Sequence, residues 1–319
     1  MKVSIIGSGA YGLALGKLIN ANKHLLTMWT FDEKEQNALD IERKSIHFKE
    51  YNVPKEIVFT MDLEKAIKDS ELIIIAVPGG AFSIMSKKLK EILKENQHIL
   101  IATKGIDNNS GKLFSNILKE DTNSKNISVM SGPTFAEDII KGTYLGFTLA
   151  TDNMETAKIV REAFESDKTK ISLIKDKIGI QVLSALKNVV AIGSGILSGM
   201  EETPSAKALY LTKAFNDIKI LIENMNGTDE AVLSYAGFGD YLMTTTSSQS
   251  RNYTYGFKIG SNDDSENYLS NTTVEGVYTL KAVYNYIKNN NINIELINIL
   301  YEIIFNKKEK ENLLKYLVD

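Results

Sequence analysis

Residues 2–16 read Lys-Val-Ser-Ile-Ile-Gly-Ser-Gly-Ala-Tyr-Gly-Leu-Ala-Leu-Gly, and this stretch decides the fold. Val3–Ile6 is a short apolar run, typical of a buried parallel strand. Gly7, Gly9 and Gly12 follow with the G-x-G-x-x-G spacing. In that pattern the first glycine permits a tight turn, the second lets the backbone approach a pyrophosphate, and the third lets the next helix pack on the strand. The stretch therefore predicts the phosphate-binding turn of a dinucleotide site.

The residues after this turn support the same interpretation. From Ala10 onward the pattern predicts a helix, whose N-terminal amides and dipole favour a diphosphate. A second strand is predicted at 24–31, and Asp32 follows Gly12 by 20 residues, where a ribose-binding acid is expected. The alternative is a structural glycine turn in another kind of α/β protein.

Composition bounds the class of protein. The chain has 319 residues, 43% of them hydrophobic and 24% charged, which suggests an ordinary globular protein of about two domains. A net charge of −3 gives no general electrostatic reason to expect a nucleic acid partner. No apolar run reaches the roughly 18 residues that span a bilayer, and the N-terminus does not resemble a signal peptide. Without cysteine there is no thiolate nucleophile. We expect a cytoplasmic protein with no integral membrane segment.

Strands and helices alternate up to about residue 176, and almost every later segment is helical. This order predicts an α/β protein with a doubly wound, mostly parallel Rossmann sheet at 1–176, followed by an all-helical domain at 177–319. Within the first domain, Thr134 is expected to cap a helix. The polar stretch 261–273 is expected to be a mobile surface loop.

Lys104 is the ionisable residue at one of three predicted strand ends that carry polar or glycine-rich motifs. Ligands of open α/β sheets bind beyond the carboxyl ends of the strands. The motifs are Val77-Pro78-Gly79-Gly80, Ala102-Thr103-Lys104-Gly105 and Ser131-Gly132-Pro133-Thr134-Phe135-Ala136. The alternative for Lys104 is a solvated surface lysine.

Lys187 lies on an apolar face of the longest predicted helix, together with Leu183, Val190 and Ser194. Burial would lower its pKa and make it a credible proton donor and acceptor. The three histidines stand at 24, 47 and 98, so a base in the second half of the chain is not histidine. The alternative is a lysine that extends to the surface.

Two later motifs carry further polar groups. Gly237-Phe238-Gly239-Asp240 places an acid beside glycines, and Gln249-Ser250-Arg251-Asn252 sets hydroxyl, guanidinium and amide side by side. Such donors suit the oxygens of a phosphate. The alternative is a helix N-cap at Ser250 or Asn252 with an exposed arginine.

Over essentially its whole length the chain resembles the bacterial NAD(P)-dependent glycerol-3-phosphate dehydrogenases. The resemblance rests on the glycine motif, the motifs at Lys104 and Gly132, Lys187-Asn188-Val189 with Ala191-Ile192-Gly193, the motifs at Asp240 and Arg251, and Val274-Glu275-Gly276. It implies that Lys187 is the catalytic proton acceptor. The substrate-binding residues that it implies are Lys104, Gly132, Thr134, Lys187, Asp240, Ser250, Arg251 and Asn252. The dinucleotide-binding residues that it implies are Ala10, Tyr11, Phe31, Lys104, Ala136, Arg251, Val274 and Glu275, beside Gly7, Gly9 and Gly12 of the loop.

The resemblance also implies an activity. It is the reversible reduction of dihydroxyacetone phosphate to sn-glycerol 3-phosphate with NAD(P)H, which supplies the backbone of phospholipids, and it needs no metal. A homodimer is implied by the family. The chain departs from the family at Ala10, where serine is usual, and at Ser205 and Lys213, where asparagine and arginine are usual.

The cofactor preference is predicted from the residues that follow the second strand. Asp32 and Glu33 would repel a 2′-phosphate, although Lys34 is close, so NAD is expected to be preferred over NADP.

Two rival functions remain. One is another Rossmann-plus-helical dehydrogenase, of the 3-hydroxyacid or 6-phosphogluconate type, which would not require the Gln-Ser-Arg-Asn cluster. The other is a non-catalytic dinucleotide sensor, which would have no reason to keep Lys187, Asp240 and Arg251 together.

Overall fold

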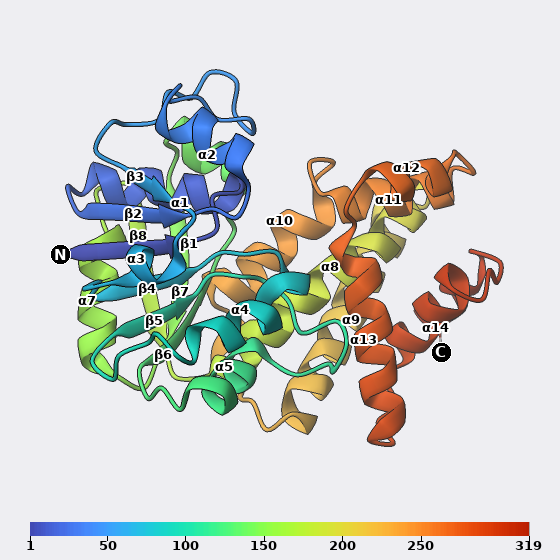
Figure 1. Cartoon of the computed structure of the whole chain (residues 1–319). Coiled ribbons are helices and arrows are strands. Elements are labelled where there is room, and N and C mark those ends of the chain that lie inside the picture. The colour runs from blue at the N-terminus through green and yellow to red at the C-terminus, as the bar shows by residue number, and fades with distance from the viewer. Residues whose placement is uncertain (319) are drawn as a thin grey trace. The chain divides into compact units, whose positions relative to one another are not determined.

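An eight-stranded sheet dominates the first half of the chain in the computed structural model, which describes residues 1–318 (Figure 1). The strands are β1 (Lys2–Ile6), β2 (Leu25–Trp29), β3 (Val58–Thr60), β4 (Leu72–Ile75), β5 (His98–Ile101), β6 (Ile127–Ser131), β7 (Leu145–Ala150) and β8 (Thr169–Ile174). Their order is β3-β2-β1-β4-β5-β6-β7-β8, and only the β6–β7 pair is antiparallel. The predicted doubly wound, mostly parallel sheet is confirmed.

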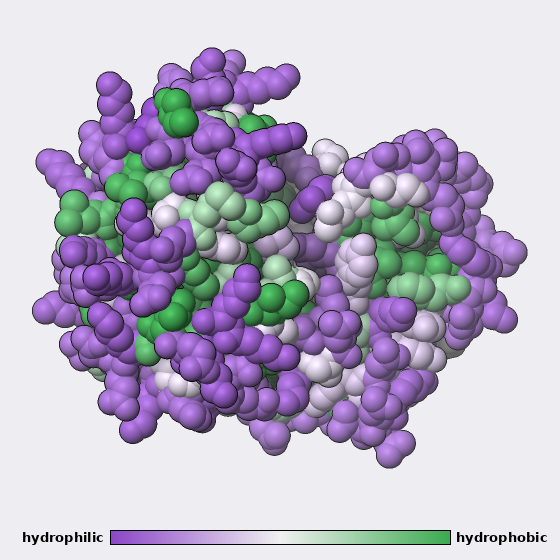
Figure 2. Space-filling model, viewed as in Figure 1, coloured by the Kyte–Doolittle hydropathy of each residue, from purple (hydrophilic) through white to green (hydrophobic). Residues whose placement is uncertain are grey.

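Helices connect most of these strands. They are α1 (Ala10–Ala21), α2 (Glu33–Asp40), α3 (Leu63–Ile67), the 3₁₀ turn η1 (Gly79–Ala81), α4 (Phe82–Leu89), α5 (Phe114–Thr122), α6 (Ala136–Lys141) and α7 (Met154–Phe164). Helix α1 packs beside α6 and α7, whereas α4 packs beside α5. The central strands β4 and β5 are fully buried, which explains why they read as continuous apolar runs rather than as alternating ones. Hydrophilic residues predominate on the molecular face drawn in Figure 2.

The turn between β1 and α1 has the predicted glycine geometry. Gly7 has a φ of 113°, which glycine adopts readily. A Cβ on Gly12 would lie 2.1 Å from the carbonyl oxygen of Gly7, so this glycine lets the helix pack against the turn. A Cβ on Gly9 would meet nothing within 4 Å. Gly12 therefore serves the packing, and Gly9 leaves open space above the loop.

The chain divides into two compact units, of which the Rossmann unit comprises Met1–Thr103 and Phe114–Lys177. The helical unit comprises Lys104–Leu113 and the chain from Ile178 onward. Sequence reasoning did not foresee that the segment after β5 belongs to the helical unit. The domain boundary between residues 176 and 177 stays a prediction.

The helical unit is built around α8 (Lys177–Gly199), whose residues are buried almost throughout. The other elements are α9 (Pro204–Asn224), the 3₁₀ turn η2 (Asp229–Ala231), the π-helix η3 (Tyr235–Gly239), α10 (Asp240–Thr246), α11 (Arg251–Gly260), α12 (Ser265–Asn271), α13 (Glu275–Asn289), α14 (Glu295–Ile304) and α15 (Asn312–Val318). By length and composition α8 could cross a membrane, but its apolar 18-residue window is 100% buried inside the protein.

Glycines let α8 and α11 approach backbone to backbone. A Cβ on Gly195 would lie 2.1 Å from the carbonyl oxygen of Tyr253, and one on Gly256 would lie 1.9 Å from that of Ile192. Gly199 and Gly260 repeat the arrangement one turn further on. Side chains larger than hydrogen are excluded on both helices, so this contact fixes the position of α11 on α8.

Some sequence predictions are wrong in this half and near α6. The stretch 261–273 is not simply a loop, because α12 forms within it and Asp264 caps it by accepting a hydrogen bond from the amide of Asn267 at 2.9 Å. Because none of the residues of this short helix is buried, its sequence is as polar as that of a loop. The N-cap of α6 is Phe135 rather than Thr134, whose hydroxyl hydrogen-bonds elsewhere.

We predict that Gly12→Ala destabilises the protein by about 1–3 kcal/mol, because the new methyl group overlaps the Gly7 carbonyl. Urea unfolding of the parent and the variant measures the difference. Gly9→Ala is the matched control and should stay within about 0.5 kcal/mol of the parent. Equal losses in the two variants would contradict this assignment.

Candidate functional site

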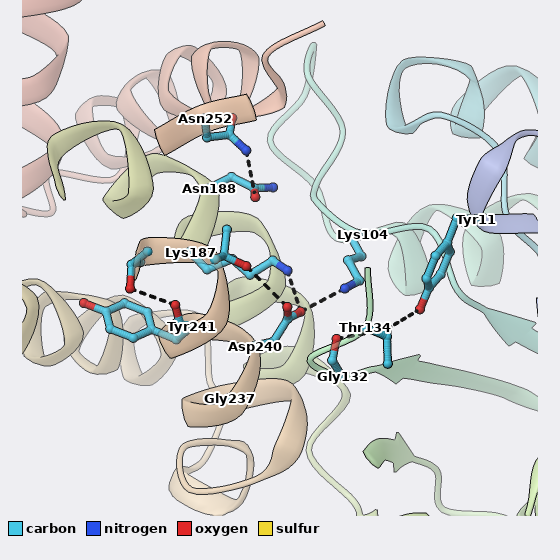
Figure 3. Close-up of polar contacts among 12 residues, drawn as sticks. Tyr11, Lys104, Gly132, Thr134, Lys187, Asn188, Gly237, Asp240, Tyr241 and Asn252 are labelled. Carbon is cyan, nitrogen blue, oxygen red and sulfur yellow. Dashed lines mark hydrogen bonds and ion pairs between the residues drawn. The ribbon is translucent and has the colours of Figure 1, made fainter. Parts of the chain in front are cut away.

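Two lysines and one aspartate of the helical unit form a buried charged cluster (Figure 3). The Nζ atom of Lys187, on α8, lies 2.5 Å from Oδ2 of Asp240, the first residue of α10. The Nζ atom of Lys104 lies 3.0 Å from the same oxygen. Asp240 is fully buried, and Thr244 donates to its other oxygen at 3.4 Å. One carboxylate thus faces two ammonium groups.

Burial decides how this cluster ionises. It lowers the pKa of Lys187 to about 7; Asp240 acts to raise that pKa, and Lys104 acts to lower it. Burial acts to raise the pKa of Asp240, but the two lysines outweigh it and the net pKa is lowered. The single carboxylate neutralises only one of the two ammonium groups. The cluster therefore carries one excess positive charge when both lysines are protonated. The Lys187 side chain is only 5% exposed, so its ammonium loses most of its hydration and its charged form is disfavoured.

The turn before α10 aims Asp240 into the cluster. A Cβ on Gly237 would lie 2.0 Å from the carbonyl oxygen of Ala231, so the π-helix η3 can close there only around glycine. The hydroxyl of Ser234 accepts from the amide of Gly237 at 3.0 Å and begins the turn. After the turn, Tyr241 donates to the carbonyl of Leu211 at 2.6 Å and anchors α10 on α9.

Asn252 connects three helices beside the cluster. Its amide nitrogen donates to Oδ1 of Asn188 at 3.0 Å, and Asn188 is the residue after Lys187. Its amide oxygen accepts from the backbone of Gly276 at 2.8 Å. The α8–α11 glycine contact and this amide bridge hold the start of α13, with Val274 and Glu275, near the Lys187 turn of α8.

Ser250 and Arg251 begin α11. The Ser250 hydroxyl accepts from the amide of Tyr253 at 3.3 Å and is the N-cap of the helix, while the Arg251 side chain is exposed. The N-cap alternative considered for Ser250 is therefore confirmed. A capping hydroxyl still has its proton to donate, so a role of these residues in phosphate binding stays a prediction.

In the Rossmann unit, the predicted dinucleotide residue Tyr11 contacts Thr134, which is predicted to bind the substrate together with Gly132. Tyr11 and Thr134 hydrogen-bond through their hydroxyls at 3.1 Å, and Thr134 donates to the carbonyl of Gly132 at 3.2 Å (Figure 3). Ala136 begins α6, and the Phe31 ring after β2 is 73% exposed. The open space at Gly9, above amides that begin α1, fits the pyrophosphate of a dinucleotide.

Sequence reasoning missed a buried acid in the Rossmann unit, Glu35. It is 8% exposed and pairs with His47 at 3.2 Å between Nε2 and Oε1. The one signal for it is its position three residues after the Asp32 N-cap, which is the spacing of a capping box. That spacing gives no hint of burial.

Family models match nearly the whole chain. The N-terminal model of NAD-dependent glycerol-3-phosphate dehydrogenase matches residues 2–157, and the C-terminal model matches residues 176–315. The chain belongs to the NAD-dependent glycerol-3-phosphate dehydrogenase family.

Individual relatives agree with the family models. A glycerol-3-phosphate dehydrogenase [NAD(P)+] from Fusobacterium nucleatum is 32% identical over 313 residues, covering 97% of this chain and 93% of that protein. The protein of the same name from Thermoanaerobacter sp. is 31% identical over 310 residues, covering 97% and 94%. The crystal structure of a Coxiella burnetii glycerol-3-phosphate dehydrogenase has a TM-score of 0.94 at 22% identity, covering 100% and 98%, which supports the fold.

The departure from this family at Lys213 has a local explanation. Its ammonium donates to the carbonyl of Tyr316 at 2.6 Å, lies 3.1 Å from Glu295, and stands 4.5 Å from the centre of the Tyr316 ring. Lys213 therefore joins α9 to α14 and α15 within the helical unit. Among residues 1–318, no corresponding contact accounts for Ser205.

We predict that Gly9→Ala weakens NADH binding about tenfold or more, about 1.4 kcal/mol, because a methyl group occupies the open space above the loop. Fluorescence titration of the free protein with NADH gives the dissociation constant. Unchanged affinity in a variant that unfolds like the parent would show that the pyrophosphate does not bind at Gly9.

Proposed function

We propose that this protein catalyses the reversible NAD(P)H-dependent reduction of dihydroxyacetone phosphate to sn-glycerol 3-phosphate. Membership of the dehydrogenase family supports the reaction, and the buried Lys187–Asp240–Lys104 cluster is the observation that carries it. The product supplies the glycerol phosphate backbone of phospholipids, and the enzyme acts in the cytoplasm as a homodimer. Light scattering of the purified protein tests the dimer.

The Rossmann unit holds the dinucleotide. Gly7, Gly9 and Gly12 shape the pyrophosphate loop, while Ala10 and Tyr11 present the first amides of α1. The bound nicotinamide supplies the hydride in one direction and accepts it in the other. Phe31, exposed after β2, offers a flat apolar face to the adenosine end. The remaining contacts that we propose come from Ala136, Lys104, Arg251, Val274 and Glu275.

Lys187 transfers the proton. With its pKa lowered to about 7 by burial, Nζ exists in both protonation states near neutral pH. As an ammonium it donates a proton to the substrate oxygen during reduction, and as an amine it takes the hydroxyl proton during oxidation. A lysine with an ordinary pKa would almost never be available as a base at neutral pH.

Asp240 and Lys104 orient and support that lysine. The carboxylate holds both ammonium groups through a single oxygen, so it fixes the direction of the Lys187 Nζ. The Lys104 ammonium, held on the same carboxylate oxygen, stabilises the negative charge that develops on the substrate oxygen as the carbonyl is reduced, so the proposed mechanism needs no metal.

Ser250, Arg251 and Asn252 bind the substrate phosphate together, and Gly132 and Thr134 complete the substrate contacts. The guanidinium of Arg251 is exposed and offers two parallel N–H groups to phosphate oxygens. Asn252 is held by Asn188 and Gly276, so it presents its remaining amide hydrogen from a fixed position.

An assay with NADH and dihydroxyacetone phosphate separates this function from its rivals. The proposed enzyme oxidises NADH with this substrate at low concentration. A 3-hydroxyacid or 6-phosphogluconate type of dehydrogenase would act on its own substrate instead. A dinucleotide sensor would bind NADH without turnover, and this outcome would refute the proposal.

We predict that Lys187→Ala lowers kcat by about 10²–10⁴-fold, the usual contribution of general acid–base catalysis, while NADH still binds. Steady-state kinetics and NADH titration measure the two effects. Lys104→Ala is the comparison, because it removes the other ammonium of the same cluster. If Lys187→Ala keeps a near-normal kcat and Lys104→Ala loses most of it, then Lys104 and not Lys187 transfers the proton.

We predict opposite pH dependences for the two directions. Oxidation needs the neutral amine, so kcat/KM for glycerol 3-phosphate should rise as pH increases through about 7, the pKa of Lys187. Reduction needs the ammonium, so kcat/KM for dihydroxyacetone phosphate should fall through the same range. Profiles that move in the same direction would contradict the assignment of Lys187.

We predict that Arg251→Lys weakens the use of dihydroxyacetone phosphate by about 1.5–3 kcal/mol in kcat/KM, because lysine cannot form the two parallel hydrogen bonds. Unphosphorylated dihydroxyacetone is the control substrate and should lose much less. Equal losses with both substrates would show that Arg251 does not contact the phosphate.

A further inference from the structure

The Rossmann unit contains a buried carboxylate, Glu35, that the proposed reaction does not use. It lies in the first turn of α2 and is 8% exposed. Thr30 donates its hydroxyl proton to Oε2 at 3.1 Å, and the His47 ring nitrogen lies 3.2 Å from Oε1. The hydrogen bond to His47 lowers the pKa of Glu35, burial acts to raise it, and hydrogen bonds to Ser8 and Thr30 lower it further. The net pKa lies below its usual value, so the group is an anion at neutral pH.

The neighbouring acids are engaged elsewhere or lie in solvent. Asp32, at the distance from Gly12 expected of the ribose-binding acid, is the N-cap of α2 and accepts from the amide of Glu35 at 2.7 Å. Glu33 is exposed, where water and salt screen its charge. Of the two acids that follow the second strand, Asp32 is therefore a helix cap and Glu33 is a screened surface charge.

Glu35, in contrast, touches both chain segments that surround the adenosine ribose in a Rossmann fold. The ribose binds where the glycine loop and the carboxyl end of the second strand come together. Ser8 belongs to the glycine loop, and Thr30 follows directly after β2, and both hydrogen-bond to Glu35. A charge held at this junction acts through buried surroundings, where water screens it little.

We propose that Glu35, rather than Asp32, is the residue that makes this enzyme prefer NAD over NADP. The proposal rests on the proposed function in so far as the protein binds a nicotinamide dinucleotide, and on the predicted preference for NAD; a parent protein that binds NADPH as tightly as NADH refutes it. NADP differs from NAD by a 2′-phosphate, and a phosphate monoester carries a charge of about −1.5 to −2 at neutral pH. A fixed, buried carboxylate at the ribose junction repels that charge. His47 contributes to the same effect, because its ring holds the Glu35 carboxylate in place. The His47 side chain itself is 33% exposed.

Fluorescence titration of the free protein with NADH and with NADPH tests this proposal without any substrate. Glu35→Gln removes the charge but keeps the shape and an oxygen for Thr30. The ratio of the NADPH to the NADH dissociation constant should fall about tenfold, about 1.4 kcal/mol, mainly through tighter NADPH binding. Asp32→Asn is the matched control, because asparagine also caps helices well, and its ratio should stay within about twofold of the parent.

Two further results would overturn the proposal. One is an unchanged ratio in Glu35→Gln with a lowered ratio in Asp32→Asn. The other is an equal loss of NADH and NADPH affinity in Glu35→Gln, which would mean that Glu35 only supports the glycine loop. If Glu35→Gln does not fold, His47→Lys places a permanent cation against the carboxylate, and an unchanged ratio in that variant refutes the proposal.

Because these titrations use no dihydroxyacetone phosphate, a failure here is separate from a failure of the proposed reaction. A parent protein that binds both dinucleotides but turns over no substrate refutes the reaction alone. Titration with adenosine 2′,5′-bisphosphate and with 5′-AMP confines the effect to the adenosine end. The two fragments should show the same fall in ratio as the whole cofactors if Glu35 acts on the 2′-phosphate.

Discussion

One buried oxygen, Oδ2 of Asp240, holds two lysine ammonium groups and so organises the helical unit around a charge imbalance. Burying three charged groups is costly unless they neutralise one another. Two positive charges against one negative charge cannot do so while both lysines are protonated. Burial, with a smaller contribution from the charge of Lys104, lowers the pKa of Lys187, the more deeply buried lysine, and so relieves this excess. The same burial that is costly for stability therefore makes Lys187 a proton donor and acceptor near neutral pH.

Backbone contacts through glycine give this cluster its surroundings. Gly195 and Gly256 bring α8 and α11 together, and Asn252 then reaches Asn188, the neighbour of Lys187. Gly237 does the same for Asp240 by allowing the π-helix to close before α10. Each of these positions excludes a side chain, so the sequence keeps glycine where helix propensity alone would disfavour it. These close backbone approaches fix where α8 and α10 place Lys187 and Asp240.

Much of this structure could be predicted from sequence where the signal is local. The glycine loop, the apolar strands and the burial of Lys187 follow from spacing and periodicity, and the structure confirms them. Long-range facts could not be predicted in this way. The assignment of the segment after β5 to the helical unit depends on tertiary contacts, as does the burial of Glu35. The capping role of Asp32 could not be predicted either, because distance along the chain does not show whether a carboxylate caps a helix.

The central claim is that burial in the Asp240 cluster makes Lys187 a base near neutral pH. The most direct measurement is an NMR titration of the unliganded enzyme that follows the lysine side-chain signals, with Lys187 assigned through its loss in Lys187→Ala. Our account predicts a titration midpoint of about 7 for this lysine. A midpoint near the ordinary lysine value of about 10.4 would contradict the account, because the amine would then be protonated throughout the neutral range.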